Sequence, residues 1–165
     1  DWLKGRWLRE KLTPDEFVAR VFDWASENGR LTEGLKLAQS RIAKLGELPP
    51  LASFLLASDV GLTPASFAGI KAPPRETLEI LETVQADLEK IFEWNVESIE
   101  AELRAIAERT GKKLKVITAP LFVAMSGSQR SLPLFDSMAL LGRSVVRQRL
   151  KVAAAVVKSM SQTGS

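Results

Sequence analysis

The sequence predicts an all-α protein made of two small packed helical subdomains. Apolar residues recur at helical spacing in one segment after another. Residues that cap helices stand at the ends of several of these segments, and no pair of segments alternates as paired strands do. Residues 61–74, rich in proline and glycine, divide the helices into two groups. We therefore place a first subdomain at residues 1–70, a second at 75–160 and a tail at 161–165.

The first group contains three predicted helices. Thr13-Pro14-Asp15-Glu16 combines an N-cap threonine, a proline at the first helical position and a glutamate at the capping-box position. The helix that begins there ends at Asn28-Gly29. We expect a second helix that Thr32 caps and Gly46 ends. A third helix should run from Pro49-Pro50 to about Ser58.

The second group shows four clear helical segments. Arg75–Phe92 is amphipathic, with leucines on one face and carboxylates elsewhere. Asn95 caps the next helix, which ends at Gly111. Pro133 begins a short helix that Gly142 closes. Ser144–Lys158 forms the last helix, and the residues after it are expected to fray.

The segment Val116–Met125 is compatible with a strand or a helix. Its β-branched residues favour a strand, but Pro120 argues against a central one. Thr118 can cap a helix with Pro120 in its first turn. We therefore predict a helix here.

The composition limits the chemistry open to the chain. Its 165 residues include no cysteine, histidine or tyrosine. Disulfides, zinc sites of the Cys/His type, Ser-His-Asp triads and imidazole general bases are therefore all excluded. Carboxylates, lysines and hydroxyls are what remains for catalysis, so the composition favours a binding module.

The same composition indicates a cytoplasmic chain with no membrane anchor. The longest apolar stretch, Val116–Met125, is far shorter than the ~18 residues that a membrane span needs. No signal peptide opens the sequence. Because it starts at Asp1 and not at methionine, we expect a fragment of a longer protein.

Charge is unevenly distributed along the chain. Residues 1–72 carry 10 basic and 9 acidic side chains, and residues 73–110 carry 4 basic and 10 acidic ones. Residues 111–165 carry 9 basic side chains and a single acidic one. A polyanionic partner for the last third is one interpretation. Solvated helix faces that neutralise one another across the fold are the other.

Three segments resemble the C-terminal half of bacterial glutamyl-tRNA synthetases. Ala119-Pro-Leu-Phe-Val-Ala-Met-Ser-Gly127, with Ser131-Leu-Pro-Leu-Phe-Asp136 and Ala139-Leu-Leu-Gly142, is similar to the closing motif of that family. Trp2-Leu-Lys-Gly-Arg-Trp-Leu-Arg9 is similar to the opening of its anticodon-binding part, with Lys4 for asparagine and Trp7 for tyrosine. Arg41-Ile-Ala-Lys-Leu45 is similar to a motif on an early helix. The signatures of the catalytic domain are absent, and the absence of histidine excludes one of them outright.

The resemblance implies an anticodon-binding helical cage that recognises the anticodon loop of tRNA(Glu). Splayed anticodon bases are read by stacking and by hydrogen bonds to their Watson–Crick edges, and basic side chains contact the phosphates. Arg41 matches the family arginine that reads the third anticodon base, which is C in this tRNA and G in the competing glutamine tRNA. Cytosine presents O2 and N3 acceptors to a guanidinium, whereas guanine presents donors there. The alternative interpretation is that Arg41 is an ordinary solvated residue on a helix.

A turn supplies the other predicted contacts. Ser131, Leu132 and Leu134 match a family turn whose backbone and apolar side chains touch the first two anticodon bases. The alternative is a simple connector between helices. Arg130 is a weaker candidate for a phosphate or base contact. Phe122 stands where the family has an arginine, and it either stacks on a base or, as we favour, lies in the core.

Further aromatic and basic residues are placed by their positions in the predicted helices. Trp24 and Trp94 are expected in the core. One subset of the basic residues in the last helix should contact RNA backbone, and the rest should be solvated. These residues are Arg143, Arg147, Arg149, Lys151 and Lys158.

Three other functions stay open. The chain can be a helical protein-interaction domain that uses the acidic helix 75–92, or a divergent paralogue with an altered tRNA preference. A stand-alone enzyme would need a pair such as Glu79 and Glu82, which is ordinary at a helix surface. In the favoured hypothesis the chain holds no catalytic centre, cofactor or metal. A catalytic domain of the same synthetase, outside this chain, would use ATP, and the protein would be a monomer.

Overall fold

The computed structural model describes residues 12–163, and all regular structure within them is helical. This confirms the all-α prediction. The opening segment Trp2–Arg9, with Lys4 and Trp7, lies outside the described residues. The α-helices are α2 (Pro14–Glu27), α3 (Gly29–Ala38), α4 (Leu48–Ala52), α5 (Pro74–Leu88), α6 (Val96–Thr110), α7 (Leu114–Ser126), α8 (Leu134–Leu141) and α9 (Arg143–Thr163). The 3₁₀ turns are η1 (Gln39–Arg41), η2 (Leu45–Glu47), η3 (Ser53–Leu55) and η4 (Pro64–Phe67).

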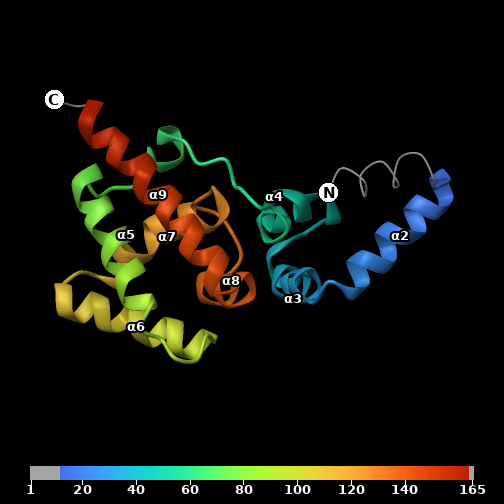
Figure 1. Ribbon diagram of the computed structural model, residues 1–165, viewed down its shortest axis with the longest axis horizontal. Coiled ribbons are helices and arrows are strands. Elements are labelled where there is room, and N and C mark those ends of the chain that lie inside the picture. The colour runs from blue at the N-terminus through green and yellow to red at the C-terminus, as the bar shows by residue number, and fades with distance from the viewer. Residues whose placement is uncertain (1–11, 164–165) are drawn as a thin grey trace.

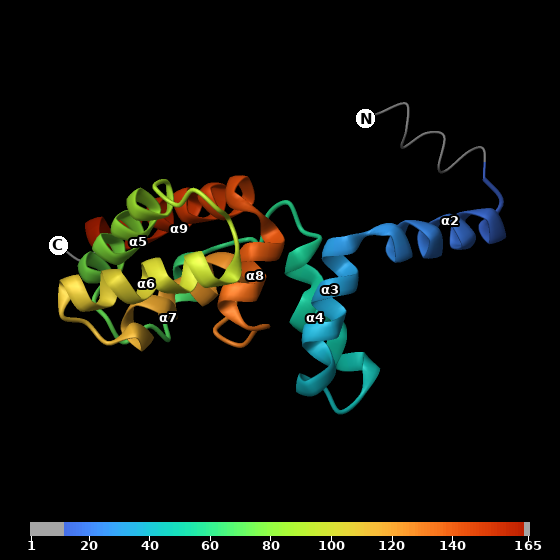
Figure 2. The ribbon, with the colours of Figure 1, turned by 90° about the horizontal axis from the view of Figure 1, so that it is seen from below.

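Helices α5–α9 form a bundle, and α3 and η3 pack against one side of it, with α4 beside α3 (Figure 1). α7 is the central helix of the bundle, because it contacts α5, α6, α8 and α9. α3 contacts α8, and η3 contacts both α7 and α8. α2 projects away from the bundle and packs on α3 (Figure 2). The segment between η3 and α5 crosses from one group of helices to the other, where the predicted linker lies.

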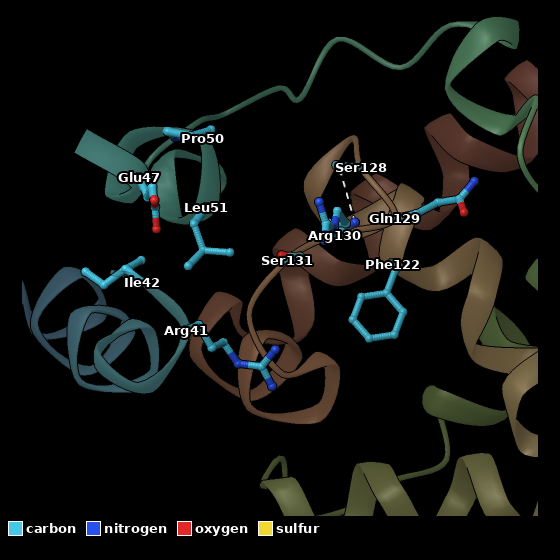
Figure 3. Close-up of a pocket in the computed structure, with 10 residues that line it drawn as sticks. All are labelled: Arg41, Ile42, Glu47, Pro50, Leu51, Phe122, Ser128, Gln129, Arg130 and Ser131. Carbon is cyan, nitrogen blue, oxygen red and sulfur yellow. Dashed lines mark hydrogen bonds between the residues drawn. The ribbon is translucent and has the colours of Figure 1, made fainter. Parts of the chain in front are cut away.

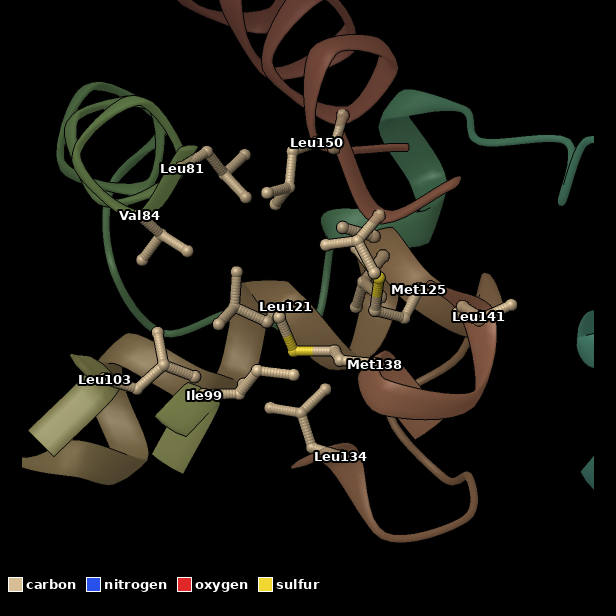
Figure 4. Packing of buried hydrophobic residues seen from close by; sticks show 14 of the residues in the cluster. Leu81, Val84, Ile99, Leu103, Leu121, Met125, Leu134, Met138, Leu141 and Leu150 are labelled. Carbon is tan, nitrogen blue, oxygen red and sulfur yellow. The ribbon is translucent and has the colours of Figure 1, made fainter. Parts of the chain in front are cut away.

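One buried apolar cluster joins the two groups of helices. Its centre lies in the bundle, where Leu121 of α7 meets Ile99 and Leu103 of α6 and Met138 of α8 (Figure 4). Residues of α3, α4 and η3 belong to the same cluster, among them Ala38 and Leu55. The cluster therefore extends over the boundary at 61–74, and the division into two subdomains stays a prediction.

Local capping signals place most helix ends correctly. Thr13 and Glu16 form the predicted capping box, with Thr13 N–H donating to Glu16 Oε2 at 2.8 Å. Asn95 caps α6 by accepting a hydrogen bond from Ser98 N–H at 2.8 Å. Gly111 ends that helix with a φ of 66°, a left-handed conformation that favours glycine. α8 begins after Pro133 and ends at Gly142, as expected.

Helix α3 differs from its prediction at both ends. Asn28, not Thr32, is the N-cap, because its side chain accepts a hydrogen bond from Leu31 N–H at 3.1 Å. The helix ends at Ala38 and not at Gly46. Beyond η1 the chain is extended at Ile42, and Ala43 N–H donates to the Glu47 carboxylate at 2.9 Å. This side-chain acceptor replaces the carbonyl that a continuing helix would have used.

Three further expectations need correction. α7 is helical as predicted, but it begins at Leu114, so Pro120 lies inside the helix and not in its first turn. α9 continues past Lys158 to Thr163, where fraying was expected. Trp24 is 52% exposed, and α2 buries none of its residues. Trp94 packs against the core as predicted but is only partly buried, and its indole N–H donates to Met138 O at 3.1 Å.

Asp87 is a buried carboxylate on α5 that links two helices. It accepts hydrogen bonds from Lys90, at 2.5 Å, and from Arg109 of α6. The hydrogen bond from Lys90 lowers the pKa of Asp87 most, burial opposes this, and Arg109 lowers the pKa further. The Asp87 carboxylate therefore makes its full contribution to the free energy of unfolding above the ordinary carboxyl pKa near ~4. This contribution is lost as the pH falls through the lower pKa of the folded state.

Asp87→Asn is expected to lower the free energy of unfolding at pH 7 by about 1.5 kcal/mol, because two charge-assisted hydrogen bonds are lost. The difference from the unmodified chain should shrink as pH falls below ~4 and through the lowered folded pKa of Asp87, because the carboxyl then becomes neutral as the asparagine side chain already is. Urea unfolding at several pH values measures this. Glu79→Gln, which removes an exposed partner of Arg75, is the control with little effect. A destabilisation that is constant with pH would contradict the role of the charge.

Candidate nucleic-acid interface

A cleft of about 770 Å³ separates the α3–α4 region from the bundle (Figure 3). Four of the six predicted contact residues line it, namely Arg41, Phe122, Arg130 and Ser131. Arg41 comes from the α3–α4 side, and the other three come from α7 and the loop that follows it. The full lining consists of Arg41, Ile42, Glu47, Pro50, Leu51, Phe122, Ser128, Gln129, Arg130 and Ser131.

Arg41 is available to a ligand. It is the last residue of η1, it is exposed, and its side chain extends across the cleft toward the side of Phe122 (Figure 3). Among the described residues no carboxylate pairs with it. Glu47 lines the same cleft, but its carboxylate accepts the hydrogen bond from Ala43 N–H. The guanidinium therefore offers all its donors to whatever enters the cleft.

The loop after α7 is ordered by serine hydroxyls. Gly127 ends α7 with a φ of 74°, and a Cβ at this position would lie 3.0 Å from Val60 O, so glycine is required. Ser126 Oγ donates to Ser128 O at 2.9 Å, and Ser128 Oγ accepts from Arg130 N–H at 3.1 Å. These bonds hold the loop at the cleft with the Arg130 side chain exposed.

The apolar candidates divide into two kinds. Leu132 and Leu134 are 0% and 5% exposed, so their side chains are part of the core and cannot touch a base. Any contact at these positions has to come from the backbone. Phe122 packs against the core as expected, but it is only partly buried and it also lines the cleft. Its position on α7 leaves part of the ring facing the cleft opposite Arg41 (Figure 3).

Comparison with known proteins agrees with this geometry. The model of a family described as the anticodon binding domain matches residues 16–154. The chain belongs to the anticodon-binding domain family. It is 77% identical over 165 residues to a glutamate–tRNA ligase of Agrobacterium fabrum, covering 100% of this chain and 34% of that protein.

Two more glutamate–tRNA ligases show the range of similarity. That of Sinorhizobium medicae is 72% identical over 164 residues, 99% of this chain and 34% of its own. That of Cellvibrio japonicus is 38% identical over 152 residues, 92% of this chain and 30% of its own. The anticodon-binding domain thus spans about a third of the length of the curated relatives it matches. It is similar to that part of these glutamate–tRNA ligases.

Three of the five predicted basic residues of α9 contact other parts of the chain, where solvent or RNA contact was expected. Arg149 is buried, and its guanidinium donates to main-chain carbonyls. Arg143 donates to the carbonyls of Glu89, Ile91 and Phe92, and it lies 5.2 Å from the ring centroid of Trp94. Arg147 pairs with Glu89 at 2.9 Å. Among the described residues, Lys151 and Lys158 are the two members of the predicted set that have neither an ion pair nor a hydrogen bond to another element. The three arginines of α9 therefore join elements of the anticodon-binding domain, and RNA contact by a subset of the basic residues stays a prediction.

Sequence reasoning missed the apolar wall of the cleft, Ile42, Pro50 and Leu51. No local pattern marks these residues, because they become neighbours of Phe122 only through packing. It also missed the burial of Arg149, for which a signal existed. Arg149 follows the buried Val146 by three positions and precedes the buried Ala153 by four, so helical spacing places it on the inner face.

Other kinds of site are not seen in the described part of the anticodon-binding domain. Within residues 12–163 no three acidic side chains come together as ligands of a metal would. None of the helices there combines the length and the apolar composition that a membrane crossing needs.

Proposed function

We propose that the cleft between α4 and α7 recognises the anticodon loop of tRNA(Glu), and that the chain serves a glutamate–tRNA ligase in this way. The observation that carries the proposal is the meeting of Arg41, Phe122 and Arg130 at one cleft, although Arg41 is remote from the other two in sequence. Two unpaired guanidiniums, a partly exposed ring and a loop with accessible backbone are the groups that single-stranded RNA recognition uses.

In this proposal Arg41 reads the third anticodon base. Its guanidinium donates to O2 and N3 of cytosine, and guanine would present donors at the same edge. A contact of this kind discriminates by about 1–3 kcal/mol, which corresponds to roughly 5- to 150-fold in affinity. Phe122 stacks on a base, and the backbone of Ser131 and its neighbours contacts the first two bases. Arg130 adds a phosphate or base contact.

The rest of the ligase reaction lies outside this chain in the proposal. ATP-dependent activation of glutamate belongs to a catalytic domain, and this chain holds neither a catalytic centre nor a cofactor. The protein acts as a monomer in the cytoplasm. The contact with the catalytic domain has a candidate surface in α2, whose exposed apolar side chains are Phe17, Val18, Val21, Phe22 and Trp24.

Binding of an anticodon stem-loop tests the reading role of Arg41. The unmodified chain should bind the tRNA(Glu) stem-loop more tightly than one with the third base changed from C to G. Arg41→Ala should abolish this preference. Arg20→Ala, which removes the same charge on α2 away from the cleft, should keep it. Both stem-loops should bind more weakly as salt rises, because phosphate contacts release counterions.

Two outcomes would contradict the proposal in different ways. Equal binding of both stem-loops by the unmodified chain would mean that the cleft binds RNA without distinguishing C from G at the third anticodon base, as expected of a divergent paralogue. If neither stem-loop binds even at low salt, the proposal that this chain recognises RNA is wrong.

A further inference from the structure

Arg149 of α9 is buried where the two groups of helices meet. The residue is 3% exposed. Nη2 donates to Phe54 O and to Ala57 O, each at 2.7 Å, and Nη1 donates to Met125 O. Phe54 and Ala57 belong to η3 and the turn after it, on the side of α4, whereas Met125 lies in the last turn of α7. One side chain therefore joins a third helix to both sides of the cleft.

The partners of Arg149 are peptide carbonyls, and no carboxylate among the described residues pairs with it. Helix C-terminal carbonyls lack intrahelical donors and carry partial negative charge, so they suit a cation. Burial lowers the pKa of Arg149, and nearby Arg30 adds to the effect, but a guanidinium titrates so high that it stays charged. Its planar fork aims donors in fixed directions, so it fixes the relative positions of the groups that it joins.

The anchoring points lie close to the cleft walls. Phe54 follows Leu51, a wall residue, by three positions, and Met125 follows Phe122, on the opposite wall, by three positions. Each anchoring carbonyl is thus about one helical turn from a side chain that lines the cleft. Arg30 of α3 reinforces the junction, since its guanidinium donates to Leu55 O at 3.4 Å and Leu141 O at 3.1 Å.

We propose that Arg149 is a positioning residue for base recognition, which sets the spacing between the Leu51 wall and the Phe122 wall of the cleft. This rests on the proposed function only for its effect on RNA. The spacing itself is a property of the free protein. Arg149 touches no base and acts through the two walls, on which Arg41, Phe122 and Arg130 are carried.

A distance measurement in the free protein tests the proposal without RNA. The chain has no cysteine, so Lys44→Cys and Lys115→Cys place spin labels uniquely on exposed residues of the two sides. In this background we expect a single narrow distance distribution. Arg149→Lys keeps the charge, but an ammonium group lacks the planar guanidinium geometry that donates to all three carbonyls. Arg149→Met removes the donors. Both should broaden or shift the distribution.

Arg147→Met on the same helix is the matched control, because Arg147 pairs with Glu89 at the surface of the bundle and does not line the cleft. It should leave the distribution unchanged. Arg149→Lys should also lose the preference for C over G in the stem-loop, while its salt-dependent binding of both stem-loops persists. A role in stability alone would lower the unfolding midpoint and leave this preference intact.

An unchanged distance distribution in folded Arg149→Lys would overturn the proposal, whatever the RNA result. If Arg149→Met fails to fold, the lysine variant still decides. If the unmodified chain shows no base preference, the proposed function fails, but the distance measurement still decides whether Arg149 sets the wall spacing.

Discussion

Replacing Leu121 by alanine is expected to lower the free energy of unfolding by about 3–5 kcal/mol, the range for large-to-small changes at a fully buried leucine. Leu121 is 0% exposed and lies on α7, which every other helix of the bundle contacts. Its side chain points into the centre of the cluster, where Ile99 and Met138 meet it (Figure 4). The surrounding helices cannot all move in to fill the resulting space, so the cavity cost adds to the loss of apolar burial.

Urea unfolding followed by far-UV circular dichroism measures this effect. Leu45→Ala is the matched control, because Leu45 is 78% exposed and its truncation should change stability by less than about 0.5 kcal/mol. A loss below about 1 kcal/mol at Leu121 would mean that the bundle collapses around the smaller side chain, contrary to a close-packed core.

Replacing Gly34 by valine is expected to lower the free energy of unfolding by about 2–3 kcal/mol through overpacking. A Cβ at this position would lie 2.0 Å from Cδ1 of Leu55 and 3.8 Å from Cδ1 of Leu132. Both leucines are 0% exposed, so neither can turn out to solvent without disturbing the core. The substitution also pushes on Leu132, which follows the loop at the cleft, so stem-loop binding should weaken as well.

Gly29→Ala is the control on the same helix. A Cβ at Gly29 meets nothing within 4 Å, so alanine should be neutral or stabilise the helix by up to about 1 kcal/mol. Thermal unfolding of the three proteins checks the pair. Unchanged stability of Gly34→Val would show that Leu55 adopts another rotamer at little cost, and that α3 and η3 are not closely packed.

Local signals account for what could be predicted. The capping box at Thr13, the cap at Asn95 and the left-handed Gly111 act within a few residues, so their effects are readable from the sequence. α3 is where this fails, because Asn28, assigned to the end of the preceding helix, also caps α3, and the Glu47 side chain competes for the backbone beyond its end. The apolar periodicity of α2 is a second case in which local signals are not enough. It shows that one face favours burial but not what covers that face.

The candidate site was predicted in its parts but not in its arrangement. The resemblance selected Arg41, Phe122, Arg130 and Ser131 from separate segments, and only the packing of α3 and η3 against α8 and α7 brings them to one cleft. The side chains of Leu132 and Leu134 were assigned to RNA because burial depends on neighbours that are distant in sequence. The α9 arginines were assigned to solvent or RNA, since net charge does not show that carbonyl groups of other helices will receive them.

The sequence by itself determined the helical class, most helix ends, the connecting segment at 61–74 and the absence of cysteine and histidine chemistry. These follow from backbone preferences and side-chain chemistry that operate over one or two turns. The tertiary structure alone decided which cations face the cleft and which join helices. The reason is that the environment of a side chain such as Arg149 is made by carbonyls at Phe54 and Met125, and no local preference connects positions so far apart in the chain.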